Sequence, residues 1–197
     1  MTKEEFHKNW TLTFPETILM SHLFKNDYSD RWFRIHSLPE SKRYAENDNE
    51  WKILLSRQNE IITDLFEQNR AIFMVTGEYI LDNQTTIHLT GKEEVFKPYL
   101  FTQLDNIDLH IQSPEDYDKG EVYSPAFTEI KWEPNQYDKL LREIANDNVR
   151  VFFLSFDQKI IVAPYDGGVD FILKDSLTKD LYKNKYKQWL SKREDGL

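Results

Sequence analysis

Three apolar runs in the last third of the chain constrain its fold more than any other feature of the sequence. They occupy residues 149–155, 159–163 and 169–173. Only Phe156-Asp157-Gln158 separates the first two runs, a spacing typical of a hairpin connection, and the third run follows Gly167-Gly168 in a second tight turn. The pattern therefore predicts three consecutive antiparallel strands.

A helix is expected directly after these strands. Asp175 or Ser176 can cap its first turn, because a side-chain oxygen there can accept a hydrogen bond from a free backbone N–H. The apolar residues that follow recur at helical spacing and should face the core: Leu177, Leu181, Tyr182, Tyr186, Trp189 and Leu190. Residues 149–191 thus form a predicted strand–strand–strand–helix unit.

The preceding part of the chain mixes strands and helices without regular alternation. Residues 31–36, 71–79 and 127–132 have the composition of strands, and residues 47–66 have the clearest helical periodicity. Strict alternation would indicate a parallel sheet, so its absence favours an antiparallel sheet with helices on one face. The predicted class is α+β, a mainly antiparallel sheet with helices packed on it, in a single domain of residues 1–197.

Two segments depart from this pattern. Residues 1–14 are expected to form a polar N-terminal arm, followed by a helix that begins near Pro15. Residues 91–125 are expected to form an irregular acidic insertion with a short strand at 107–111. A strand at 85–89 should pair with the strand at 71–79.

The composition limits the classes of function. There are 34 acidic against 25 basic residues, a formal net charge of −9, whereas binding to nucleic acid needs clustered positive charge. The chain has no cysteine, which excludes thiolate metal sites and thiol nucleophiles. No apolar run approaches the roughly 18 residues of a membrane span, and the polar start does not resemble a signal peptide. We therefore expect a cytoplasmic protein without nucleic-acid or membrane contacts.

One motif resembles that of a known family. It consists of Pro164, Tyr165, Asp166, Gly168, Val169 and Asp170, followed by a helix with Leu181, Tyr182, Tyr186, Trp189 and Leu190. The motif is similar to that of uncharacterised bacterial domains of unknown function, so the resemblance implies a shared fold and no particular activity. That family often has an arginine beside the first glycine of the turn, where this chain has Gly167-Gly168, so no role of that arginine carries over. In size, acidity and architecture the chain also resembles immunity proteins of bacterial toxin systems.

The turn at 165–170 is the first candidate site. Pro164 fixes φ and the two glycines permit positive φ, so Tyr165, Asp166 and Asp170 could be directed at a ligand or a partner. In the alternative interpretation the residues are structural, with Asp166 capping its own turn and Tyr165 packing on the final helix.

Arg34 and His36 form the second candidate site. They alternate along a predicted strand and should point the same way, so with Lys42 and Arg43 they could form a small anion pocket. The alternative is an ordinary ion pair between Arg34 and an acid such as Asp170.

The third candidate is the acidic group Asp116, Asp118 and Glu121, which lies among aromatic residues and could bind a basic partner. The alternative is a solvated loop. These acids lack the glycine and the spacing of a calcium loop, and the five histidines lack metal-ligand spacing. No metal and no cofactor is expected.

Together these features predict a protein-binding module. Its most specific form is an immunity-type protein that neutralises a basic effector through the acidic surface at 105–121 and the turn at 165–170. The alternative is a small-ligand-binding protein or an enzyme that uses Asp166 or Asp170 with Arg34 or His36. No catalytic motif is present, so no catalytic residue is assigned.

Overall fold

The structure, a computed structural model, describes residues 1–80 and 94–192. Its helices are α1 (Lys3–Thr13), α2 (Phe24–Asp27), α3 (Asp48–Phe66), α4 (Leu109–Gln112), α5 (Asp138–Ala145) and α6 (Ser176–Lys185). Its strands are β1 (Trp32–His36), β2 (Ala71–Ile80), β3 (Thr102–Gln103), β4 (Ile107–Asp108), β5 (Val122–Lys131), β6 (Val151–Ser155), β7 (Ile160–Pro164) and β8 (Gly168–Ile172). Short 3-10 turns lie at Pro39–Ser41, Glu94–Phe96 and Lys187–Trp189.

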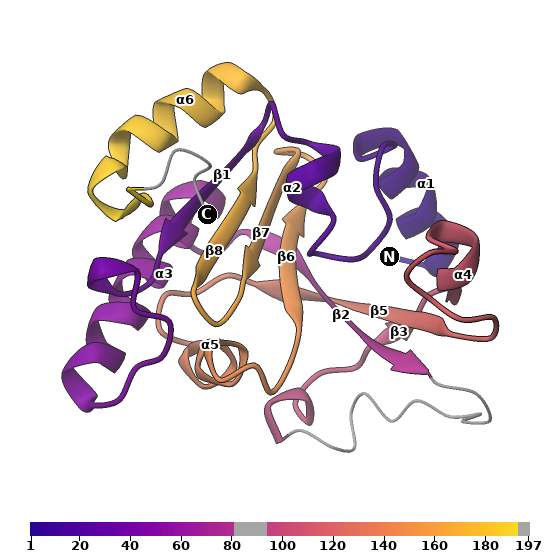
Figure 1. Cartoon of the computed structure of the whole chain (residues 1–197), viewed down its shortest axis with the longest axis horizontal. Coiled ribbons are helices and arrows are strands. Elements are labelled where there is room, and N and C mark those ends of the chain that lie inside the picture. Colours follow the sequence, from indigo (N-terminus) through magenta and orange to yellow (C-terminus); the bar gives the residue numbers. More distant parts are fainter. Residues whose placement is uncertain (81–93, 193–197) are drawn as a thin grey trace.

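The described strands form one sheet, in which every paired neighbour runs antiparallel. The order across the sheet is β1-β8-β7-β6-β2-β5-β3, and β4 pairs with β5 outside this path (Figure 1). The hairpin of β6 and β7, the following strand β8 and the long strand β2 appear where the sequence predicts them, whereas β5 begins at Val122, within the predicted insertion, instead of at 127. The α+β class with a mainly antiparallel sheet is confirmed.

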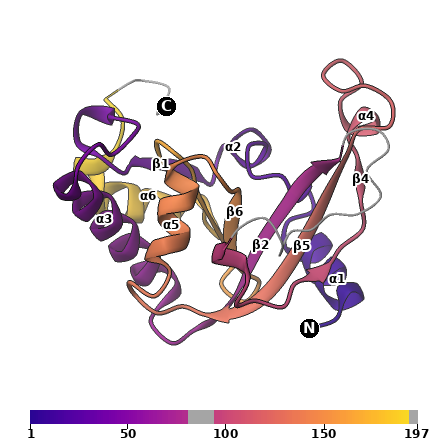
Figure 2. The ribbon, with the colours of Figure 1, turned by 90° about the horizontal axis from the view of Figure 1, so that it is seen from below.

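Helices cover both faces of this sheet, so the expectation of helices on one face was wrong. α3, α5 and α6 pack on the face that carries Phe33, Phe153 and Phe171. α1 and α2 pack on the opposite face, against Phe152 and Leu154 of β6. Figure 2 shows α3, α5 and α6 together on one side of the molecule and α1 on the other. The physical reason is that β6, β7 and β8 are buried at every position, so both of their faces need cover.

The first residues form a packed helix instead of the expected polar arm. Thr2 and Glu5 make a capping box at the start of α1, in which each side chain accepts a hydrogen bond from the other residue's backbone N–H. Phe6 and Trp10, four residues apart, are buried against the sheet. The helix expected near Pro15 does not form there, since the chain continues in turns until the single turn of α2.

α3 agrees with its prediction, and α6 agrees only in part. The side chain of Asn47 caps α3 and that of Asp175 caps α6, each by accepting a backbone N–H. In α6, however, Leu177 and Leu181 are 81% and 64% exposed, although both were expected in the core. The helix meets the core through Tyr186, which is buried, and through the partly buried residues Tyr182, Trp189 and Leu190.

The segment before β5 is short of regular structure, as expected. The predicted strand at 107–111 is confirmed only for β4, because Asp108 caps α4 and ends the extended backbone there. The strand predicted at 85–89 lies outside the described residues. In the described ranges, no helix has both the length and the apolar character needed to cross a membrane.

Candidate functional site

The register of the sheet places Arg34 of β1 opposite Asp170 of β8. The guanidinium donates Nε–H to Oδ1 at 2.6 Å and Nη2–H to Oδ2 at 2.8 Å, and Trp32 Nε1–H donates to Oδ1 at 3.0 Å. The two charged side chains are only 14% and 11% exposed. The ion pair that the sequence suggested is therefore present, in a buried and bidentate form.

Tyr165 lies against this ion pair. The guanidinium carbon of Arg34 is 4.4 Å from the centre of the Tyr165 ring, within the range of a cation–π interaction. Burial, together with the nearby carboxylates of Asp170 and Asp166, raises the pKa of Tyr165, so its hydroxyl stays protonated. The cation–π contact of Tyr165 is thus with β1, whereas the alternative interpretation of the sequence placed this ring on the final helix.

Asp166 has different partners from those of Asp170. Its Oδ2 accepts hydrogen bonds from Arg43 Nε at 2.5 Å and from the Tyr44 hydroxyl at 2.9 Å, and its side chain is 6% exposed. Asp166 therefore ties the β7–β8 turn to the segment before α3, whereas we expected it to cap its own turn. Backbone hydrogen bonds between Tyr165 and Gly168 close that turn instead.

The glycines of this turn serve a different purpose from the expected one. Among the described glycines only Gly120 has positive φ, so Gly167 and Gly168 are not needed for a left-handed backbone. A Cβ atom on Gly168 would lie 2.0 Å from the carbonyl oxygen of Ile35 in β1. Gly168 is therefore required because the two strands approach closely at this point.

Arg34, Tyr165 and Asp170 line a pocket of about 390 Å³, which we call the Arg34 pocket. The other residues that line it are Ser21, His22, Lys25, Tyr79, Ile144, Asp147, Val149, Arg150, Val151, Ala163 and Pro164. Sequence reasoning missed His22 and Arg150, which lie in connecting segments, and Lys25, which lies in the single turn of α2, because no local pattern predicts where these segments meet.

His36 and Asp166 do not line this pocket. His36 lines a separate pocket of about 200 Å³ with Arg57 and Trp189. Neither ring nitrogen of His36 has a hydrogen-bond partner among the described residues. Burial, with Arg34 and Arg57 nearby, lowers the pKa of His36, so the ring is neutral at pH 7.

The anion pocket expected from Arg34, His36, Lys42 and Arg43 does not form. Lys42 Nζ lies 2.7 Å from Oε1 of Glu50 and 2.9 Å from Oε2 of Glu46, and Arg43 is paired with Asp166. Each of these cations therefore already has a carboxylate partner, as Arg34 does. Of the four groups named for the alternative enzyme site, Arg34 and Asp170 lie together in the Arg34 pocket, whereas His36 lines another pocket and Asp166 is paired with Arg43.

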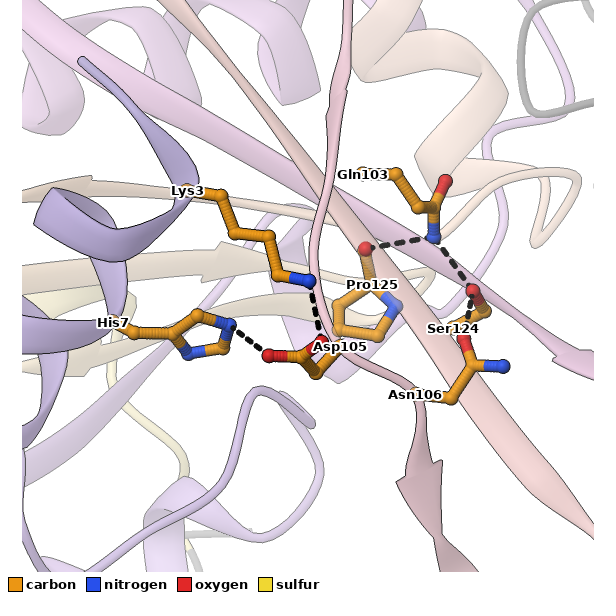
Figure 3. Close-up of polar contacts among 7 residues, drawn as sticks. All are labelled: Lys3, His7, Gln103, Asp105, Asn106, Ser124 and Pro125. Atoms are coloured by element: carbon orange, nitrogen blue, oxygen red, sulfur yellow. Dashed lines mark hydrogen bonds and ion pairs between the residues drawn. The ribbon is translucent and has the colours of Figure 1, made fainter.

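Part of the expected acidic surface at 105–121 is engaged within the molecule. Asp105 forms an ion pair with Lys3 of α1, and its Oδ2 lies 3.2 Å from Nε2 of His7 (Figure 3). On the β5 side, Gln103 Nε2 donates to Ser124 Oγ at 2.6 Å and to the Pro125 carbonyl at 3.0 Å. The segment before β4 is thus held between α1 and β5, so Asp105 contributes little free charge.

The acids that follow α4 are more accessible. Asp116 and Asp118 are exposed, and Glu121 is half-buried. Asp116 accepts a hydrogen bond from Ser113 Oγ at 2.6 Å, and Glu121 accepts one from the backbone N–H of Asp118 at 3.3 Å. None of the three acids forms an ion pair with a described lysine, arginine or histidine.

Asp116 also lines a groove of about 850 Å³ between residues 15–23 and α4, which we call the acidic groove. The other residues that line it are Pro15, Glu16, Thr17, Ile18, Met20, His22, Leu23, Asp27, Leu109, Gln112, Ser113 and Tyr117. Sequence reasoning missed both Glu16, which it placed at the start of a helix, and Asp27, which it interpreted only as a residue that ends that helix. Pro15, a residue common in turns, was the available signal for an irregular segment.

No group of three or more His, Cys, Asp or Glu side chains is placed to hold a metal ion within residues 1–80 and 94–192. A family model with the description "Domain of unknown function (DUF3885)" matches residues 20–194. The chain belongs to the DUF3885 family. The DUF3885 region contains every residue of the Arg34 pocket but leaves out α1. This assignment confirms the predicted resemblance to a domain family of unknown function, and no curated protein or solved structure matches the chain.

Proposed function

We propose that this DUF3885 protein binds a basic segment of another protein in the acidic groove. The observation that carries the proposal is the set of three carboxylates that line the groove, Glu16, Asp27 and Asp116. None of them is paired with a lysine or arginine in the described part of the chain. A basic side chain entering the groove would supply the missing opposite charge.

The floor of the groove is apolar. Met20 and Leu109 are buried in a small hydrophobic cluster, and Ile18, Leu23 and Tyr117 pack against it while remaining partly exposed. Apolar surface surrounded by charged groups is the usual composition of a protein–protein interface. The occupant that fits both features is a segment with basic residues next to apolar ones.

The surrounding charge supports the same proposal. Asp118 and Glu121 lie close to Asp116 in the chain, and the net charge of −9 gives the molecule a negative field. Such a field speeds the encounter with a basic partner. In the most specific form of the proposal, the partner is a basic effector, and this protein neutralises it by binding to it. The turn at 165–170 is not part of this proposed surface, because Arg43 and Arg34 already neutralise Asp166 and Asp170.

Charge reversal tests this proposal. A partner captured from the native cytosol would be titrated against the wild-type protein and against the variant D116K/D118K/E121K, at low and moderate salt. The variant should associate at least about tenfold more slowly, because steering depends on these charges, and the difference should shrink as salt rises.

The matched control is E60K/E129K/D157K, which changes the net charge equally at exposed positions away from the groove. It should associate at nearly the wild-type rate. Equal slowing by both triple variants would show that only total charge matters, and the acids at 116, 118 and 121 would then be rejected as part of the binding surface.

A further inference from the structure

The Arg34 pocket is lined by more cationic side chains than are paired with carboxylates in the described part of the chain. Lys25 and Arg150 line it, and neither forms an ion pair with a described carboxylate. Among the described residues, the Arg150 side chain donates one long hydrogen bond, 3.4 Å from Nη1 to the Tyr79 hydroxyl, and its guanidinium carbon lies 5.6 Å from the centre of that ring. Of the two acids in the pocket, Asp170 is neutralised by Arg34, which leaves Asp147 as the remaining acid beside two cations without a described carboxylate partner. In a protein with a net charge of −9, such a local excess of positive charge is suited to an anion.

His22 adds a third group that can respond to an anion. Burial, together with Arg150 and Lys25, lowers the pKa of His22, and Asp27 opposes this effect only in part. The ring is therefore neutral at pH 7 when the pocket is empty. An anion between the two cations would cancel their repulsion and favour the protonated ring, which would then donate a hydrogen bond.

The remaining walls are apolar and aromatic. Val151 and Ala163 belong to β6 and β7, and the rings of Tyr79 and Tyr165 also line the pocket. Its lining residues also come from the segment that leads into α2 and from the connection between α5 and β6, two elements labelled in Figure 1. A volume of about 390 Å³ is within the range of pockets that hold small organic ligands.

We propose that the Arg34 pocket binds a small phosphate monoester with a planar apolar body. The phosphate group lies between Lys25, Arg150 and His22, and the body packs against Tyr79 and Tyr165. Three cationic donors match the two negative charges and three terminal oxygens of such a phosphate better than they match the single charge of a carboxylate. The Arg34–Asp170 pair forms a fixed wall of the site, because each of its charges already has a partner.

The probe that tests this site is phenyl phosphate, titrated into the full-length protein while the histidine ring signals are followed by NMR. The spectrum of H22Q assigns the His22 signal. Saturation should raise the pKa of His22 by at least half a unit, about threefold in the protonation equilibrium. Benzoate should bind at least about tenfold more weakly, because it has one negative charge fewer.

The deciding variant is K25Q/R150Q, since these two residues line the Arg34 pocket and not the acidic groove. This variant should bind phenyl phosphate at least about tenfold more weakly than the wild type, because each charge-assisted hydrogen bond contributes substantially to binding. The control K8Q/K174Q removes the same charge at exposed positions outside the pocket and should bind like the wild type.

The proposed site would be refuted if phenyl phosphate did not bind, or if both double variants bound it more weakly to the same extent. Benzoate binding as tight as phenyl phosphate would overturn the assignment to a phosphate. Neither result bears on the acidic groove, because the titration contains no protein partner.

Discussion

Replacing Asp170 by asparagine measures how strongly the buried ion pair stabilises the sheet. The carboxylate accepts two hydrogen bonds from Arg34 and one from Trp32, at a position where it is 11% exposed. Asparagine keeps the shape but leaves the guanidinium buried without its carboxylate. Breaking a buried pair in this way costs about 3–5 kcal/mol. For a chain of this length each 1 kcal/mol lowers Tm by about 2–4 °C, so D170N should lose roughly 6–20 °C.

The assay is urea unfolding of the wild type, D170N, R34M and the double variant. The two single variants should each destabilise, and R34M/D170N should be more stable than the sum of their effects predicts, because no lone buried charge remains. The control E40Q removes the highly exposed contact with Lys192 and should leave Tm unchanged. A loss below about 1 kcal/mol in D170N, or strict additivity in the double variant, would refute the reasoning.

Three further predictions concern packing and pH. Gly168→Ala would place a methyl group 2.0 Å from a β1 carbonyl oxygen and should lower the free energy of unfolding in urea by about 1–3 kcal/mol. Gly167→Ala would meet only the edge of a tyrosine ring, so its loss should be smaller. The reverse order would contradict the close approach of the two strands at Gly168. Phe6→Ala should lower the free energy of unfolding by about 3–5 kcal/mol, because Phe6 is buried. Leu12→Ala, at a side chain that is 72% exposed, should lower it by less than about 0.5 kcal/mol. Similar small losses in both variants would mean that α1 contributes little to stability. Because the pKa of His36 is lowered in the folded state, the unfolded chain binds the extra proton below about pH 6.5, so stability should fall from pH 7 towards pH 5. His36→Gln should flatten this part of the pH–stability curve, and an unchanged slope would assign it to other groups.

Local patterns were enough to predict the elements whose signals do not depend on distant contacts. The periodicity of α3 predicts the helix, since this signal acts within a few residues, and of the possible caps Asn47, Asp48 and Asn49 the structure uses Asn47. Turn chemistry likewise predicts the β6–β7 hairpin. For α6 the periodicity gave the helix but not its orientation, because spacing does not determine which side of a helix meets the sheet. Leu177 and Leu181 are therefore exposed, although they belong to the predicted apolar face.

The error at the N-terminus has a similar cause. α1 buries Phe6 and Trp10, and its remaining residues are mostly polar, so its average composition is that of an arm. The local signal that was present is the spacing of Thr2 and Glu5, which matches a capping box. Phe6 and Trp10 are enough to hold α1 on the sheet, because the face on which they pack is apolar and has to be shielded from water.

The candidate sites were predictable only as individual residues. Opposite charge suggested the pairing of Arg34 with Asp170, but the register that places them together depends on strands 136 residues apart. The same limit applies to Lys25 and Arg150, which no local pattern connects with that pair. The type of a single residue indicates which interactions it can make, whereas the residues that meet in one pocket are determined by the complete topology of the fold.

The position of β1 also determines the order of events while the chain is being made. β1 is an edge strand, and its described partner in the sheet is β8. At synthesis rates of about 5–20 residues per second, the 136 residues between Arg34 and Asp170 take roughly 7–27 s to appear. During that interval β2, β5 and β6 can already pair, while Trp32 and Phe33 belong to an unpaired strand. Nascent chains are therefore most exposed to pairing with one another in these seconds, and a chain that stops before β8 would keep that open edge permanently.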